Sequence, residues 1–172
     1  MRFSFLFRDI AAANRLTPFF TCVLAVLLSV TPVHVPGLAV ATPAFALMAV
    51  YHWSLHRPDL LPASATFAVG LLLDLLAGTP YVGLSSLTLL VARGLVLSQR
   101  RFIAGKPFAI VWAGFLAVAA IVTALAWGLT SLLSTVSLGS RPFVFQAIVT
   151  VAGFPAISWL LAQVQRGLLR RV

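Results

Sequence analysis

The sequence has 172 residues, of which 61% are hydrophobic and only 9% are charged, with a mean hydropathy of +1.07. A soluble domain has about one-quarter charged residues, so this composition excludes an ordinary soluble protein. Twelve Lys and Arg against three Asp give a net charge of +9, which in so apolar a chain favours anionic lipid over nucleic acid as a partner. The lone Cys22 leaves no disulfide framework or thiolate metal cluster within the chain.

Six apolar stretches separated by short connections each approach the ~20 residues that a transmembrane helix needs. In chain order they cover about residues 16–33, 38–53, 62–77, 83–98, 107–133 and 142–164. The second stretch ends in a polar run from His52 to Asp59, a tight turn from Gly78 to Pro80 follows the third, and a basic loop from Gln99 to Lys106 follows the fourth. The sequence therefore predicts an all-α integral membrane protein, with residues 1–172 forming a single transmembrane domain.

The distribution of basic residues predicts the orientation of these spans. If both termini lie in the cytoplasm, ten of the twelve basic residues are inside, Arg141 is outside and Arg93 lies within the fourth span. This asymmetry is the one that the positive-inside rule requires. We expect a multi-pass protein of the bacterial inner membrane.

An alternative interpretation treats the N-terminus as a secretory signal peptide that is cleaved after residues 44–46. The interval between the apolar core, about residues 19–30, and that site is long, and cleavage would cut the second span in half. A mass measurement of the mature N-terminus distinguishes the two interpretations.

The polar side chains do not form a pattern typical of catalysis, and we expect no catalytic, cofactor-binding or metal-binding residues. Asp9, Asp59 and Asp74 lie too far apart in the chain to share a helix face as paired carboxylates. His52 and His56 are four residues apart and could share a helix face as metal ligands, but a third ligand requires Asp59 to fold back. Hydrogen bonding at the membrane boundary is the other interpretation of this histidine pair.

Asp74 requires an explanation, because a carboxylate inside a span costs several kcal/mol unless it is protonated, hydrated or paired. Small or polar residues recur every four positions on one face of the third span, at Thr66, Gly70, Asp74 and Gly78. Such a face permits close approach of another helix. We expect Asp74 to organise the turn to Gly83 and the helix packing, with a transport or partner-contact role as the alternative.

Arg93 lies in the fourth span and cannot lose its charge. Pairing with Asp74 is disfavoured, because the predicted span boundaries place the two residues about 10 Å apart in depth. We expect Arg93 to extend toward the cytoplasm beside Arg100, which lies seven residues later on the same face. Contact with a partner helix is the alternative.

Residues 51–84 contain an aromatic pair before an Arg-Pro loop, a Phe-x-x-Gly-Leu-x-x-Asp-Leu-Leu helix and a Gly-x-Pro-x-x-Gly turn. The positions of this pattern are Trp53, Pro58, Phe67, Gly70, Asp74, Gly78, Pro80 and Gly83. The pattern resembles that of the MreD family. Length and hydropathy agree over nearly the whole chain, and beyond residue 90 the similarity is one of hydropathy alone.

The resemblance implies a noncatalytic membrane subunit of the bacterial rod-shape (elongation) complex. It implies that the subunit links MreC, RodA and a penicillin-binding transpeptidase to the cytoskeletal protein MreB, without a cofactor. It also implies a fold similar to that of the six-helix substrate-binding S components of energy-coupling-factor vitamin transporters. From the residues themselves, we expect the small-residue face around Gly70 to hold a single-span partner; a second copy of the chain is another candidate partner.

The main alternative function is that of a vitamin-binding S component, in which Asp74, Gln146 and nearby hydroxyl groups would bind the ligand near the external turns. An intramembrane enzyme is a third class, and it would need reactive groups that the sequence lacks.

Overall fold

A computed structural model of the chain describes residues 3–31, 43–103, 105–134 and 140–169, with side chains between residues 17 and 163 of those ranges. The described residues form helices and no strands. The helices are α1 (Phe3–Val30), α2 (Phe45–His56), the 3-10 helix η1 (Pro58–Leu60), α3 (Ala63–Ala77), α4 (Leu84–Ile103), α5 (Phe108–Leu133) and α6 (Arg141–Leu169). The predicted all-helical class and the six main helices are confirmed for this part of the chain. The start of the predicted second span, residues 38–42, lies outside the described residues.

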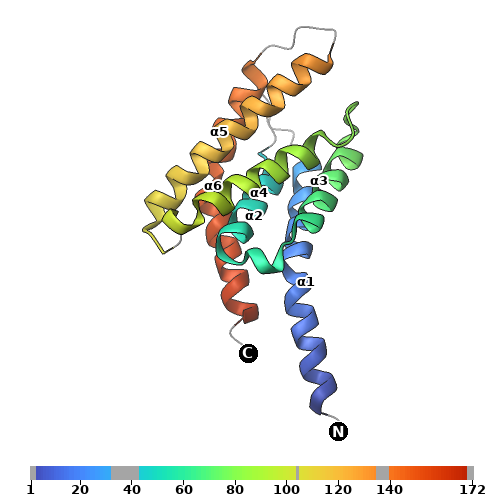
Figure 1. Ribbon diagram of the computed structural model, residues 1–172, viewed down its shortest axis with the longest axis vertical. Helices are drawn as coiled ribbons and strands as arrows, with labels where there is room; N and C mark the ends of the chain where they lie inside the picture. Colours follow the sequence, from blue (N-terminus) through green and yellow to red (C-terminus); the bar gives the residue numbers. More distant parts are fainter. Residues whose placement is uncertain (1–2, 32–42, 104, 135–139, 170–172) are drawn as a thin grey trace.

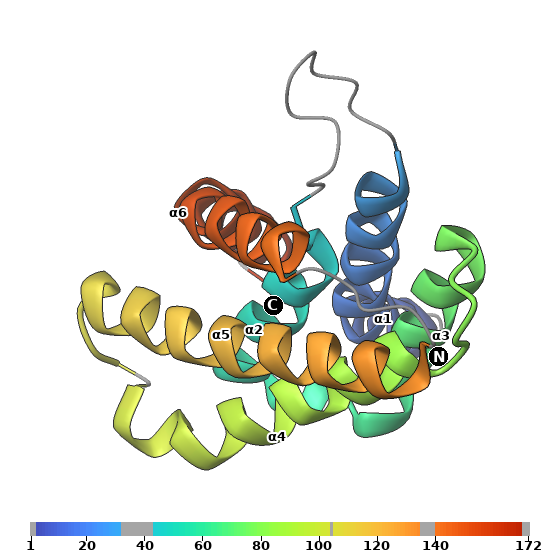
Figure 2. The same ribbon diagram turned by 90° about the horizontal axis from the view of Figure 1, so that it is seen from above.

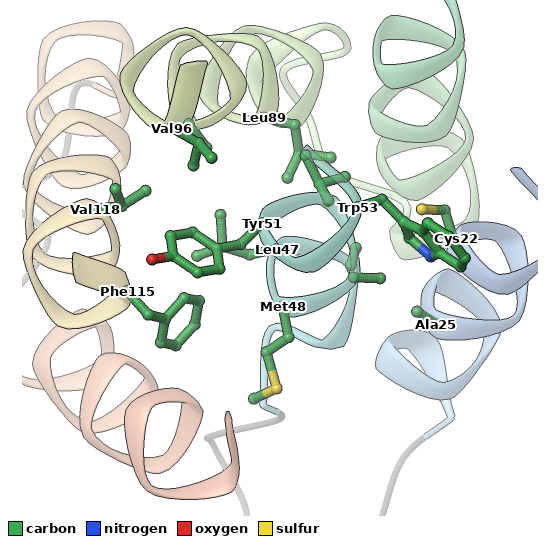
Figure 3. Packing of buried hydrophobic residues seen from close by; sticks show 14 of the residues in the cluster. Cys22, Ala25, Leu47, Met48, Tyr51, Trp53, Leu89, Val96, Phe115 and Val118 are labelled. Carbon is green, nitrogen blue, oxygen red and sulfur yellow. The ribbon is translucent and has the colours of Figure 1, made fainter. Parts of the chain in front are cut away.

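Helix α2 forms the centre of the molecule. Every residue from Ala46 to Leu55 is buried, and α2 contacts α1, α4 and α6. The other helices are arranged around it so that α3 lies between α1 and α4, and α5 lies between α4 and α6 (Figure 2). Figure 3 shows side chains of α2 pointing in opposite directions, with Tyr51 toward Phe115 of α5 and Trp53 toward Cys22 of α1. A helix that is apolar on all sides is typical of such an enclosed position.

An aromatic cluster joins α2, α5 and α6. The rings of Phe115 and Phe154 stack with centroids 4.0 Å apart, and Tyr51 meets both edge-on at 5.0 and 5.5 Å. The Tyr51 hydroxyl donates a hydrogen bond to the Val111 carbonyl oxygen at 2.9 Å. Burial of a tyrosine with its hydroxyl bonded stabilises the core without leaving a polar atom unsatisfied.

Several helices extend beyond the predicted apolar spans. Helix α1 begins at Phe3, α6 continues to Leu169, and α4 continues to Ile103. The prediction of a basic loop from Gln99 to Lys106 was therefore wrong for its first half, which is helical. Hydropathy marks only the part of a helix that faces apolar surroundings, whereas Arg, Gln and Lys are good helix formers and continue the helix.

The polar run at the end of the predicted second span lies partly inside a helix. Helix α2 continues to His56, so His52 and Ser54 lie inside the helix and are buried. Neighbouring helices cover this end of α2, and burial therefore depends on tertiary contacts that hydropathy does not register.

Two of the described helices are long and apolar enough to cross a membrane, Phe108–Leu133 and Arg141–Gln163, with mean hydropathies of 2.4 and 1.8. The segments Thr17–Val30 and Ala63–Ala77 are apolar but shorter. Helix α2 has 12 residues and is thus about 18 Å long, less than the ~30 Å thickness of a hydrocarbon core. Length and hydropathy therefore support membrane crossing more strongly for α5 and α6 than for α2 and α3.

Figure 1 shows the start of α1 and the end of α6 at the same end of the molecule. The turn between α3 and α4 lies toward the opposite end. This arrangement separates the polar groups described below into two regions, one at each end of α3.

Candidate functional site

The hairpin formed by α3 and α4 depends on glycines at the end of α3 and before α4. Gly78 follows the last residue of α3 with φ +62°, a left-handed conformation that glycine adopts without steric cost. The amide groups of Gly78 and Thr79 both donate to the Asp74 carbonyl oxygen, which closes the helix end. Gly83, with φ +101°, precedes α4, and its carbonyl oxygen accepts the amide of Leu87. The chain thus reverses direction within a few residues and brings the start of α4 beside the last turn of α3.

The Asp74 side chain lies at the centre of this hairpin and is 1% exposed. Its Oδ2 atom accepts hydrogen bonds from the backbone amides of Gly83 at 2.7 Å and Ser85 at 3.1 Å. Its Oδ1 atom accepts from the Ser85 amide at 3.2 Å and from the Thr79 hydroxyl at 3.4 Å. A carboxylate from α3 thus caps the N-terminus of α4, where unpaired amides and the helix dipole favour negative charge. These contacts satisfy the carboxylate without an arginine.

The closest backbone approach in the hairpin is at Gly70. A Cβ atom added there would lie 2.4 Å from the Ser86 Cα atom and 2.7 Å from its amide nitrogen. The Ser86 hydroxyl donates to the Phe67 carbonyl oxygen at 3.2 Å. Helix α4 therefore covers the face of α3 that contains Gly70 and Asp74.

This arrangement corrects the hypothesis that the small-residue face of α3 holds a single-span partner. The face is already filled by α4 of the same chain, and Thr66, Gly70 and Asp74 are buried. A larger side chain at Gly70 would first disturb the α3–α4 contact. Partner contacts must therefore use another surface.

At the other end of α3, two arginines of α4 bind backbone carbonyl groups. The Arg93 Nε atom donates to the Leu61 carbonyl oxygen at 3.0 Å, and the Arg100 Nε atom donates to the Leu55 carbonyl oxygen at 3.1 Å. Leu55 is in the last turn of α2, and Leu61 lies between η1 and α3. The two arginines thus fix the connection between α2 and α3 against α4. Arg93 extends away from Asp74, because its acceptor Leu61 comes before the start of α3, whereas Asp74 lies 11 residues, about 17 Å, after Ala63 along that helix.

Replacing Arg93 by methionine should test this contact, because methionine retains most of the apolar stem but not the donor. We expect a loss of about 1 kcal/mol, since a hydrogen bond from a charged group contributes about 1.5–3 kcal/mol and Arg93 is only half-buried. The melting temperature of the purified protein in detergent should fall by about 2–4 °C. The exposed Arg101, changed to methionine in the same way, is the matched control and should have little effect. Equal melting temperatures for both variants would contradict a structural role for Arg93.

The remaining positions of the family pattern fall into buried and exposed groups. Trp53 is buried and its Nε1 atom donates to the Thr21 hydroxyl at 2.9 Å, which joins α2 to α1. Pro58 is buried as the first residue of η1, where its fixed φ suits a helix start. Pro80 is exposed in the hairpin turn, and the Phe67 side chain is 47% exposed. The structure therefore brings Gly70, Asp74, Gly78, Pro80 and Gly83 together, and leaves Trp53, Pro58 and Arg93 near the other end of α3.

The histidine pair forms a local contact within α2. The rings of His52 and His56 stack with centroids 4.4 Å apart, and the His56 Nδ1 atom lies 2.9 Å from the His52 carbonyl oxygen. Within the described parts of the chain, no three His, Cys, Asp or Glu side chains come together as metal ligands would. The two histidine rings thus contact each other, and His52 also meets the ring of Trp53 edge-on.

Several residues that complete these contacts were not predicted from the sequence. Ser85, Ser86 and Thr79 supply the partners of Asp74 and Gly70, and small residues directly after Gly83 were the available signal. The Trp112 Nε1 atom donates to the Val151 carbonyl oxygen at 3.1 Å. Pro155 has no amide to donate to that carbonyl four residues earlier, so a proline within α6 predicts the need for another donor.

A small cavity of about 160 Å³ lies between α2, α4, α5 and α6. Its polar lining includes the side chains of Ser85, Thr88, Thr123, Gln146 and Thr150. Sites for small organic ligands typically measure about 300–1,000 Å³. The volume of this small cavity therefore does not favour the vitamin-binding alternative.

Among the described residues, the buried carboxylate of Asp74 and the side chains of Arg93 and Arg100 bind the protein's own backbone, and two helices are long and apolar enough to cross a membrane. These features are those of an all-helical protein with two helices that are able to cross a membrane and with buried polar groups that serve its own packing. A family model described as rod shape-determining protein MreD matches residues 12–166, and the chain belongs to the MreD family. No curated protein and no solved structure matches the chain. The family is one of membrane proteins that determine rod shape, and it is not an enzyme family.

Proposed function

We propose that the chain is a noncatalytic scaffold subunit of the rod-shape complex in the bacterial inner membrane. In this proposal it links MreC and the peptidoglycan synthases, RodA and a penicillin-binding transpeptidase, to the MreB cytoskeleton. The MreD family membership supports the role in rod shape. The partners, the S-component-like fold and a homodimer are expectations from the resemblance that extend beyond this coarser role.

The observation that carries the proposal is the bonding of Asp74. This carboxylate is the acidic group that lies within an apolar helix, and the amides of Gly83 and Ser85 bind both of its oxygen atoms. A carboxylate bound in this way is unsuited to act as a general base or to coordinate a cargo, because its acceptor positions are already in use. A protein whose buried polar groups serve its own packing acts on others through its surface.

The proposed orientation has both termini in the cytoplasm. The start of α1 and the end of α6 lie at one end of the molecule (Figure 1). In the sequence, the basic residues at both chain ends would then share the cytoplasmic side with Arg100, Arg101 and Lys106. This grouping agrees with the positive-inside rule.

Phe67 is our candidate for a contact with MreC. It matches the family pattern, yet its side chain is 47% exposed on α3, whereas the other aromatic residue of the pattern, Trp53, is 1% exposed. Because nearly half of the Phe67 side chain is left uncovered beside the α3–α4 contact, it can contact a neighbouring transmembrane helix. Helix association in lipid depends on such van der Waals contacts.

Replacing Phe67 by alanine should therefore reduce co-purification of MreC and convert rod-shaped cells to round ones when the variant is the sole copy. The melting temperature should change little, because the ring is half-exposed and contributes little to the core. Phe145 of α6, 43% exposed, provides a matched control for the loss of a lipid-facing phenyl ring. Rod-shaped cells with normal recovery of MreC in the Phe67→Ala strain would contradict this contact.

A further inference from the structure

A second, larger cavity of about 480 Å³ opens between α2, α5 and α6. Its volume lies in the range of sites that bind organic ligands. The walls include Leu55 and His56 at the end of α2, Phe108 at the start of α5, and Phe154 and Trp159 of α6. Lys106, from the connection between α4 and α5, completes the lining. None of the carboxylate groups among the described residues lines this large cavity.

The large cavity is lined by a cationic side chain from the α4–α5 connection and by aromatic rings from α6, with His52 and Ser158 also in the lining. Lys106 and His56 lie where α4 joins α5 and where α2 ends, and both are exposed. The aromatic rings of Phe154 and Trp159 line the part formed by α6, and the Trp159 side chain is 63% exposed. Exposed tryptophan and lysine side chains are both typical of the boundary between lipid and water. The large cavity therefore has the polarity of an amphiphile, with a cationic end and an apolar end.

The start of α5 strengthens the positive potential at the cationic end. Helix α5 has 26 residues, and no side chain caps its N-terminus at Pro107. The first amides of an uncapped helix, together with its dipole, attract anions. Lys106 is adjacent to this terminus in the chain, and Phe108 is its first residue. A lysine and a helix terminus together provide the hydrogen-bond donors that a phosphate group requires.

The apolar wall is held in place by internal contacts. Phe154 stacks on Phe115, and the Ser158 hydroxyl donates to the Pro155 carbonyl oxygen at 3.0 Å. The bond from Trp112 to the Val151 carbonyl joins α5 to α6 one turn before Pro155. A wall supported in this way is preformed, so binding requires little ordering of side chains.

We propose that the large cavity binds an anionic membrane phospholipid. Lys106 and the first-turn amides of α5 bind the headgroup phosphate, and the wall formed by Phe154 and Trp159 receives the glycerol and the start of an acyl chain. The charge complementarity follows from a cationic end without a carboxylate, and the apolar wall distinguishes a lipid from a free phosphate ion. The site is independent of the proposed contact at Phe67, so the two proposals fail separately.

Native mass spectrometry of the full chain in detergent, titrated separately with phosphatidylglycerol and phosphatidylcholine, tests the proposal. We expect the protein to bind phosphatidylglycerol several-fold more tightly, and Lys106→Gln to lower this preference by about fivefold, the effect of one basic residue near an anionic lipid. Arg101→Gln removes an exposed charge at the same end of α4 but outside the lining, and it should leave the preference unchanged. Ala162→Phe should fill the large cavity and reduce binding of both lipids.

Three results would overturn the proposal. One is equal affinity of the unmodified protein for the two lipids, and another is an unchanged preference in Lys106→Gln. The third is displacement of phosphatidylglycerol by millimolar inorganic phosphate, which would indicate a phosphate-ion site. If Ala162→Phe does not fold, the comparison of Lys106→Gln with Arg101→Gln still decides, because both residues are exposed and neither supports the core.

Discussion

Replacing Gly70 by alanine should lower the melting temperature of the protein by roughly 5 °C or more. The added Cβ atom would lie 2.4 Å from the Ser86 Cα atom, a separation that real Cβ atoms do not show, so α3 and α4 must move apart. Overpacking typically costs about 1–3 kcal/mol, and the upper part of this range applies because the obstructing atoms belong to the backbone and cannot rotate away. Thermal unfolding in detergent, followed by the reactivity of the buried Cys22 thiol, measures the effect.

Gly94 provides the matched control for this substitution. It lies within α4, and a Cβ atom added there meets nothing within 4 Å. Alanine at this position should leave stability unchanged or raise it by up to about 1 kcal/mol, because alanine is the better helix former. If Gly70→Ala and Gly94→Ala unfold at the same temperature, the close approach of α3 to α4 is not a determinant of stability.

Replacing Asp74 by alanine should have an effect of similar or greater size. The amides of Gly83 and Ser85 would lose their acceptor, and each buried donor left unpaired costs about 1–3 kcal/mol. We therefore expect a fall in melting temperature of about 5–10 °C and a smaller amount of inserted protein. Asp74→Asn should be intermediate, because the amide retains one oxygen acceptor but places an NH₂ group near a backbone donor.

Asp59 is the control for Asp74. It is exposed in η1, and alanine or asparagine there should change the free energy of unfolding by no more than about 0.5 kcal/mol. The proposed scaffold role adds a second readout, since destabilisation of the hairpin by Asp74→Ala should also cause rounding of cells. Wild-type stability of Asp74→Ala would contradict the capping of α4 by this side chain.

Helix α3 and the start of α4 could be predicted closely from the sequence, because strong local signals bound them. The predicted third span, 62–77, differs little from Ala63–Ala77, since Pro62 precedes the helix and Gly78 ends it. The role of Asp74 in the turn followed from the same reasoning, because a carboxylate in a span needs donors and a turn supplies amides. Its individual partners could not be predicted, because they depend on how the turn brings Ser85 back to α3.

Other features depended on contacts between distant segments and were beyond the sequence signals. The target of Arg93 is a carbonyl 32 residues earlier, and a pattern within one helix cannot indicate it. The burial of His52 and Ser54 arises because α2 is enclosed by its neighbours, whereas hydropathy scores them as polar. The small-residue face of α3 was identified, but its assignment to a partner was wrong because the sequence cannot distinguish an internal helix from an external one.

The local nature of the Asp74 contacts bears on how the protein reaches its folded state during synthesis. Its amide donors follow Asp74 by only 9 and 11 residues. Helices α3 and α4 can thus leave the translocon as a pair, with the acidic group already shielded by hydrogen bonds, before α5 and α6 have been synthesised. Helix α2 is short and buried along nearly its whole length. Its position between α1, α4 and α6 can therefore be fixed only after α4 and α6 have been synthesised.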